Sequence, residues 1–153
     1  MYRTPYLVFK SARLESEWSG GGTQKGAGLH PALYVVVLAA AHWHYRTLGK
    51  PAELTCLLRT PEEQKAIYPD RRDFRSPHEF GRAADLRTLG LSPETSRLWE
   101  EWLNLTFSYR GKAGARTALV HEVHGLGEHL HLQIGPQEAA PKMPESFVLH
   151  SVT

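Results

Sequence analysis

Residues 76–87 read Ser-Pro-His-Glu-Phe-Gly-Arg-Ala-Ala-Asp-Leu-Arg, and the interpretation of the whole chain starts from this stretch. His78 and Asp85 lie seven positions apart, with Gly81 and the small Ala83 between them. Such small residues let two pieces of backbone approach closely, so that an imidazole and a carboxylate can face each other. Asp85 also has apolar neighbours, where a carboxylate is costly to bury unless it is paired or metal-bound. The stretch therefore predicts a metal-binding loop and strand.

A second cluster, Glu128-His129-Leu130-His131, can supply a third ligand for the same metal. Two imidazole nitrogens and one carboxylate oxygen suit Zn²⁺ with a fourth position open for water, which is the arrangement of catalytic zinc. Taken alone, His78 would be an ordinary loop histidine, and Asp85 would pair with Arg82 or Arg87. Taken with the second cluster, these residues favour one zinc ion and a zinc hydrolase.

The composition is that of a soluble globular domain, with 41% hydrophobic and 22% charged residues. We expect the 153 residues to form a single domain. A formal charge of +2 and the lack of a long basic run argue against nucleic-acid binding. Cys56 is the only cysteine, which excludes an internal disulfide and a cysteine-built metal site, and we interpret it as a buried, inert thiol.

The N-terminal residues 1–13 lack the apolar segment and the cleavage site of a signal peptide. We therefore expect the protein to be cytoplasmic as synthesised. No apolar stretch reaches the roughly 18 residues that span a bilayer, which argues against membrane insertion.

Hydrophobic patterns and helix-start signals predict an α+β fold, with a small, largely antiparallel sheet and flanking helices. Residues 19–28 are expected to form a flexible loop, and residues 136–153 a surface tail. The predicted helices cover residues 31–48, 61–68 and 92–107. The predicted strands cover residues 5–10, 53–59, 117–124 and 129–134.

The last two strands are predicted to form a hairpin. If His124 pairs with His129, then Glu122 lies opposite His131. On that register these four polar side chains share one face of the hairpin, and apolar side chains occupy the other.

The motif Ser76-x-His78-x-x-Gly81-x-Ala83-x-Asp85 matches in full the zinc-binding signature of the D-alanyl-D-alanine carboxypeptidase family. That family shares its fold with phage endolysins that cut the peptidoglycan stem peptide and with the zinc domain of hedgehog proteins. His129-Leu130-His131 resembles the family's His-x-His element, and residues 57–64 resemble the segment that precedes the zinc motif. The resemblance covers roughly residues 54–134, in the same order.

The resemblance implies three zinc ligands, namely His78, Asp85 and His131. It also implies that Arg59 holds the substrate carbonyl and stabilises the developing oxyanion, a task that suits a permanently charged guanidinium. The alternative for Arg59 is a surface arginine at the end of a strand.

Three further residues are implied as substrate contacts: Ser76, Gln64 and His129. Ser76 would contact substrate or orient its loop, and His129 would face substrate or hydrogen-bond to a zinc ligand.

Two glutamates are candidates for the general base. In the bacterial enzymes a glutamate stands three residues before the last zinc ligand, and Glu128 holds that position here. Strand alternation argues for Glu122 instead, because a residue three positions before His131 points away from it. We favour Glu128 and keep Glu122 as the alternative.

The sequence thus predicts a zinc peptidase that cuts peptidoglycan stem peptides, as a D,D-carboxypeptidase or an endolysin-type endopeptidase. The glutamate would take a proton from a water activated by zinc. Without a signal peptide, such an enzyme would reach the cell wall as a phage or prophage product. The alternatives are a non-catalytic zinc-containing binding domain of the same fold and a metal-free structural protein.

Overall fold

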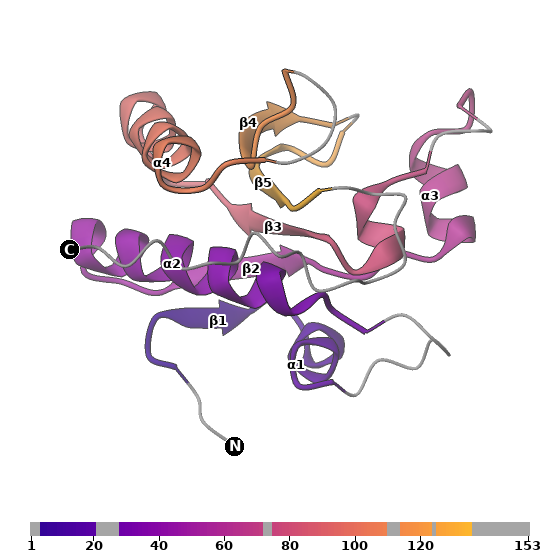
Figure 1. Ribbon diagram of the computed structural model, residues 1–153, viewed down its shortest axis with the longest axis horizontal. Helices are drawn as coiled ribbons and strands as arrows, with labels where there is room; N and C mark the ends of the chain where they lie inside the picture. The colour runs from indigo at the N-terminus through magenta and orange to yellow at the C-terminus, as the bar shows by residue number, and fades with distance from the viewer. Residues whose placement is uncertain (1–3, 21–27, 72–74, 110–113, 124, 136–153) are drawn as a thin grey trace.

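The computed structural model describes residues 4–20, 28–71, 75–109, 114–123 and 125–135 (Figure 1). Most of the predicted flexible loop and the whole predicted tail lie outside this part of the chain. Across the described residues, no helix combines the length and the apolar character needed to cross a membrane.

A five-stranded sheet forms the centre of the structure, in the spatial order β1-β2-β3-β5-β4. β1 runs parallel to β2, and the other neighbouring strands are antiparallel. The fold is therefore α+β with a mixed, largely antiparallel sheet, as predicted. The strands are β1 (Leu7–Phe9), β2 (Ala52–Cys56), β3 (Ala83–Arg87), β4 (Ala118–Glu122) and β5 (Glu128–Gln133).

The helices of the described residues are α1 (Ala12–Trp18), α2 (Pro31–Leu48), α3 (Pro61–Ile67), η1 (Pro77–Phe80), which is a 3-10 helix, and α4 (Pro93–Thr106). α2, α3 and α4 match the predicted helices to within one residue at each end. Each begins at a proline that follows a capping side chain, from His30, Thr60 and Ser92 respectively. The short helix α1 was not predicted.

The hydrophobic core lies between the sheet and the helices α2 and α4 (Figure 1). Trp99 of α4 is fully buried in it, and its indole N–H donates to the carbonyl of Ala40 in α2 at 3.0 Å. The sheet contributes Leu86, Leu130 and Leu132, none of which is exposed. Because side chains alternate along a strand, the residues between these leucines lie on the opposite face of β3 and β5.

The predicted register of the last hairpin is wrong. In the structure Glu122 pairs with Glu128, so that His121, three residues before His124, lies opposite His129. The turn is completed by Gly125 and Gly127, with φ angles of 72° and 76°, and β5 then begins at Glu128. The predicted and observed registers differ by three residues, which is an odd number. Every side chain of β4 therefore lies on the face of the sheet opposite to the predicted one.

Candidate metal centre

The carboxylate of Asp85 lies at the middle of the candidate site. Asp85 belongs to β3, which is bounded by β2 and β5 in the interior of the sheet. Its neighbours Ala84 and Leu86 are fully buried in the core, so alternation directs Asp85 to the opposite face. The residue is only 5% exposed there, and a carboxylate so deeply buried needs charged or hydrogen-bonding partners.

His78 supplies the first of these partners from η1. Its Nδ1–H donates to the carbonyl of Leu57 at 2.7 Å, and its Nε2 lies 3.2 Å from Asp85 Oδ1. A backbone carbonyl can only accept, so this contact fixes the tautomer and turns the other ring nitrogen toward Asp85. Metal-binding histidines are commonly oriented through their second ring nitrogen in this way.

Two local features hold the backbone around His78. Ser76 caps η1 by accepting from the backbone N–H of His78 at 3.3 Å, and Glu79 caps it reciprocally by accepting from the N–H of Ser76 at 2.9 Å. Gly81 ends η1 with a φ of 65°, and a Cβ there would lie 2.2 Å from the carbonyl oxygen of Gly28. Glycine is therefore required at this position.

The strand β5 brings two further imidazoles to the same carboxylate. His131 Nδ1 lies 2.9 Å from Asp85 Oδ1, and His129 Nε2 lies 3.7 Å from that oxygen. The two rings stand two residues apart on β5, so they share one face of the sheet. The predicted ligands His78, Asp85 and His131 therefore meet at one carboxylate oxygen.

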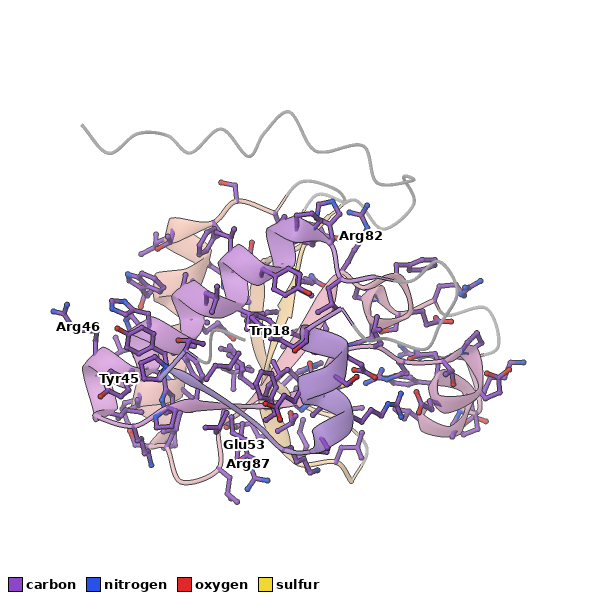
Figure 2. All side chains as sticks on the ribbon, turned by 90° about the horizontal axis from the view of Figure 1, so that it is seen from below. Trp18, Tyr45, Arg46, Glu53, Arg82 and Arg87 are labelled. Atoms are coloured by element: carbon purple, nitrogen blue, oxygen red, sulfur yellow. The ribbon has the colours of Figure 1, made fainter. Side chains whose placement is uncertain are left out.

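The predicted alternative partner Arg87 pairs with Glu53 of β2 instead of with Asp85, with Nε and Oε2 3.1 Å apart (Figure 2). The ion-pair partners found for Asp85 are His78, His129 and His131. A cluster of imidazoles around one carboxylate is a donor set that suits zinc.

The charges of the site are strongly coupled. Burial by itself would raise the pKa of Asp85, but the charge of His78 and the hydrogen bonds from His131 and His78 hold that pKa well below its usual value. Burial would likewise lower the pKa of His78, yet Asp85 and Cys56 raise it to about 10. In the metal-free protein the pair is therefore ionised, and a divalent cation would take the place of the His78 proton.

His121 of β4 is a member of the site that the sequence analysis missed. Its ring centroid lies 4.7 Å from that of His129 and 5.6 Å from that of His131. Burial, followed by the charge of His129, lowers the pKa of His121, which favours the neutral imidazole that binds metals. A correct hairpin register would have revealed His121, since it pairs directly with His129.

Six potential ligands gather on this face in two groups. The inner group consists of Cys56, His78 and Asp85, and the outer group consists of His121, His129 and His131. Within each group the ligand atoms lie within 4.8 Å of one another. The 2.9 Å contact between Asp85 and His131 joins the two groups.

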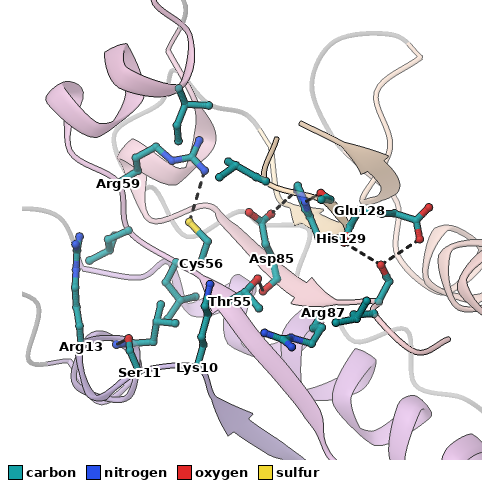
Figure 3. Close-up of a pocket in the computed structure, with 18 of the residues that line it drawn as sticks. Lys10, Ser11, Arg13, Thr55, Cys56, Arg59, Asp85, Arg87, Glu128 and His129 are labelled. Carbon is teal, nitrogen blue, oxygen red and sulfur yellow. Dashed lines mark hydrogen bonds and ion pairs between the residues drawn. The ribbon is translucent and has the colours of Figure 1, made fainter. Parts of the chain in front are cut away.

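Cys56 differs from its prediction as a buried, inert thiol. The residue is half-buried at the end of β2, and its sulfur lies 3.6 Å from His78 Nδ1. Arg59 Nη2 also lies 3.6 Å from that sulfur, and Arg59 Nη1 donates to Gln64 Oε1 at 2.9 Å. Arg59 is therefore held beside the inner group by Gln64, as Figure 3 shows for its contact with Cys56.

The two candidate bases lie away from the ligands. Glu122 and Glu128 face each other across the hairpin, at register positions that share the leucine face of β5. Glu128 accepts a hydrogen bond from Thr88 Oγ1 at 3.1 Å, and Figure 3 shows it directed away from Asp85. The expectation that Glu122 shares a face with His131 is therefore wrong. Glu128 lines a cavity together with His129 but lies on the other face of β5 from the histidines.

Of the three predicted substrate contacts, two are buried and one lines a cavity. Ser76 and Gln64 are only 3% and 4% exposed, and their described contacts orient the loop of His78 and the guanidinium of Arg59. His129 lies at the surface of a cavity of about 960 Å³ that Asp85, Cys56 and Arg59 also line (Figure 3). Of the six potential ligands, Cys56, Asp85 and His129 line this cavity, so a molecule bound in it would contact each group through at least one residue.

Comparisons with known protein families, with curated proteins and with solved structures found no match to this chain. The resemblance to the D-alanyl-D-alanine carboxypeptidase family therefore rests on the motif residues themselves. What the fold and the site define is a class: an α+β protein with a cluster of histidines around a buried aspartate that could bind a metal.

Proposed function

We propose that this chain is a zinc-dependent peptidase of the hedgehog/D-Ala-D-Ala-peptidase type that hydrolyses peptidoglycan stem peptides. One observation supports the proposal above all others. Asp85 Oδ1 lies 3.2 Å from His78 Nε2 and 2.9 Å from His131 Nδ1. Two histidines and one aspartate that converge from η1, β3 and β5 leave room for a water or substrate ligand on a four-coordinate ion.

The donor set fits zinc on its chemistry. His78, Asp85 and His131 offer two nitrogens and one oxygen, and the hydrogen bond from His78 to Leu57 supplies the outer contact that zinc-binding histidines usually have. When bound, zinc polarises a substrate carbonyl and lowers the pKa of a coordinated water.

Arg59 would bind the carbonyl oxygen of the scissile peptide as negative charge develops on it. Its guanidinium lines the cavity, is oriented by Gln64 and forms no ion pair with a carboxylate of the described residues. A fixed positive charge held in place by a neutral side chain is suited to this electrostatic role.

His129 would accept the proton of the attacking water. Its Nε2 lies 3.7 Å from Asp85 Oδ1, and the residue lines the cavity. Glu122 and Glu128 occupy the opposite face of the hairpin, and Glu128, which also lines the cavity, is hydrogen-bonded to Thr88. An imidazole beside the reacting water can take up this proton and return it to the leaving amine. This assignment replaces the glutamate that the sequence favoured.

The proposed substrate follows from the motif resemblance and from the size of the cavity. A cavity of about 960 Å³ has room for several residues of a peptide. Both a D,D-carboxypeptidase and an endolysin-type endopeptidase fit these observations. An enzyme of either kind would act on the cell wall, for example as a phage or prophage product.

A non-catalytic zinc-containing binding domain is the second candidate. The observation in its favour is that neither glutamate, Glu122 or Glu128, faces the histidines. Such a domain would bind zinc and peptidoglycan fragments and leave every peptide bond intact.

The test combines zinc analysis with digestion of purified peptidoglycan and mass spectrometry of the products. We expect about one zinc or more per chain, new peptide termini in the stem, and loss of hydrolysis in His78→Ala. His42→Ala, which changes an exposed histidine of α2, is the matched control and should behave as the wild type. Zinc binding without any new terminus would favour the binding domain, and a zinc-free protein would rule out both candidates.

A further inference from the structure

The metal centre contains more ligands than one zinc ion can use. Zinc in proteins is almost always four-coordinate, and a catalytic ion keeps one of the four positions open. The proposed catalytic ion would use three of the six donors, His78, Asp85 and His131. This leaves Cys56 in the inner group and His121 and His129 in the outer group.

His121 and His129 have the geometry of a chelating pair. They are directly opposite each other on the antiparallel strands β4 and β5, and their ring centroids are 4.7 Å apart. Side chains at directly paired positions on one face approach closely enough to share a ligand. Two nitrogens bound to one tetrahedral zinc lie about 3.4 Å apart, so nitrogens within 4.8 Å of each other need only small ring rotations.

The Nε2 atom of His121 provides a separate indication of a ligand. It is buried and has no hydrogen-bond partner within the described part of the chain. A buried polar atom without a partner is costly, and native proteins usually satisfy it with a protein group, a water or an ion. The rings of His129 and His131 pack edge-on against the ring of His121. Neither forms a hydrogen bond with this buried nitrogen.

We propose that His121 and His129 form a second transition-metal site beside the catalytic one. The site would bind a divalent ion that favours imidazole, such as Zn²⁺, Ni²⁺ or Cu²⁺, and water would occupy the remaining coordination positions of that ion. The inference rests on the proposed function, because the three donors count as unused only if His78, Asp85 and His131 bind the catalytic zinc. Because His129 is also the proposed proton acceptor, an ion bound there would inhibit hydrolysis when zinc is in excess.

The test is the number of zinc ions bound per folded chain after equilibrium dialysis against buffered zinc, measured by elemental analysis. We expect two ions in the wild type, two in the surface control His42→Ala, and one in His121→Ala. His121→Gln, which retains a polar side chain, serves as a second variant and should also bind one. Far-UV circular dichroism of each variant verifies that the sheet has formed.

Two ions in the wild type and one in both folded His121 variants support the proposal. A single ion in the wild type overturns it, whichever variant then loses that ion, and so does retention of two ions by the folded variants. The proposed function fails separately. If His78→Ala keeps its full zinc content, or if peptidoglycan is not cut, the catalytic assignment is wrong whatever His121→Ala binds.

Discussion

The inner and outer groups of the metal centre are held by the fold in different ways. The inner His78 and Asp85 have side chains that are 2% and 7% exposed, and His78 is anchored to the Leu57 carbonyl and to a capped 3-10 helix. The outer His129 and His131 have side chains that are each 12% exposed. They lie on β5, and the register of the β4–β5 hairpin decides which residues of β4 lie beside them. The inner group is therefore pre-organised, while the outer group can adapt to a second ligand or a proton.

This difference indicates a division of tasks. Rigid ligands discriminate between metal ions and hold one geometry, and a partly exposed imidazole can exchange protons with substrate and solvent. Variants that separate the two groups are the direct way to test the comparison.

The largest effect is expected from Asp85→Asn in the inner group. The change removes the one negative charge on which His78, His129 and His131 converge, so the catalytic ion and hydrolysis should be lost, and only the ion of the His121 and His129 pair should remain. Zinc content and peptide release measure the two losses. Glu53→Gln, which breaks the partly exposed ion pair with Arg87, is the control and should retain both properties. An active Asp85→Asn protein would contradict the proposed catalytic site.

The next largest effect is expected from His129→Ala in the outer group. Removal of a general base lowers turnover by about 10²–10⁴-fold, while the ion held by His78, Asp85 and His131 should remain. Steady-state rates with a stem-peptide substrate, together with zinc content, measure the result. Glu128→Gln is the matched comparison on the other face of β5 and should stay within a few-fold of the wild type. If Glu128→Gln is instead the inactive variant, the assignment of the base returns to the glutamate.

A smaller effect, on stability, is expected from Gly81→Ala. Alanine at a φ of 65° is strained, and its Cβ would meet the Gly28 carbonyl oxygen at 2.2 Å. We expect the free energy of unfolding to fall by about 1–3 kcal/mol, with weaker zinc binding, because η1 must shift. Urea denaturation measures the change. Gly49→Ala has a similar φ of 70° with nothing within 4 Å, so it isolates the strain without the contact. Equal losses in the two variants would show that the contact does not constrain the inner group.

The smallest effect is expected from a histidine outside both groups. Burial lowers the pKa of His44 below 6.5, and the His44 Nδ1–H donates to the carbonyl of Lys50 at 2.9 Å. Since the unfolded chain then binds the proton more readily, stability is full above pH 6.5 and declines as the pH falls below it. Urea midpoints at pH 7.5 and pH 5.5 measure the decline, and His44→Gln should reduce it. An unchanged pH dependence in that variant would assign the decline to other groups.

Much of the fold could be predicted from local signals. Pro31 and Gly49 bound α2, and the reciprocal cap between Thr60 and Glu63 begins α3 as expected. The helix α1 was missed because its seven residues carry little periodicity, and tertiary contacts stabilise it: Glu17 of this helix accepts from the backbone N–H of Leu58 at 3.3 Å.

Local spacing also allowed part of the candidate site to be predicted. His78 and Asp85 could be paired from their spacing, since one short segment contains both. His121 could not be found, because a hairpin register depends on how the glycine turn closes, and an odd shift reverses the face of every residue on the strand.

By itself, the sequence determined the helices with strong end signals, the α+β class, and the histidines and aspartate that could bind a metal. Those features depend on neighbours within a few positions along the chain. Only the tertiary structure decided which side of the sheet each strand residue faces. It brought His121 and Cys56 to the site and placed Glu122 and Glu128 on the other face of the hairpin from the histidines. Strand pairing between distant segments sets these positions, and no local pattern carries that information.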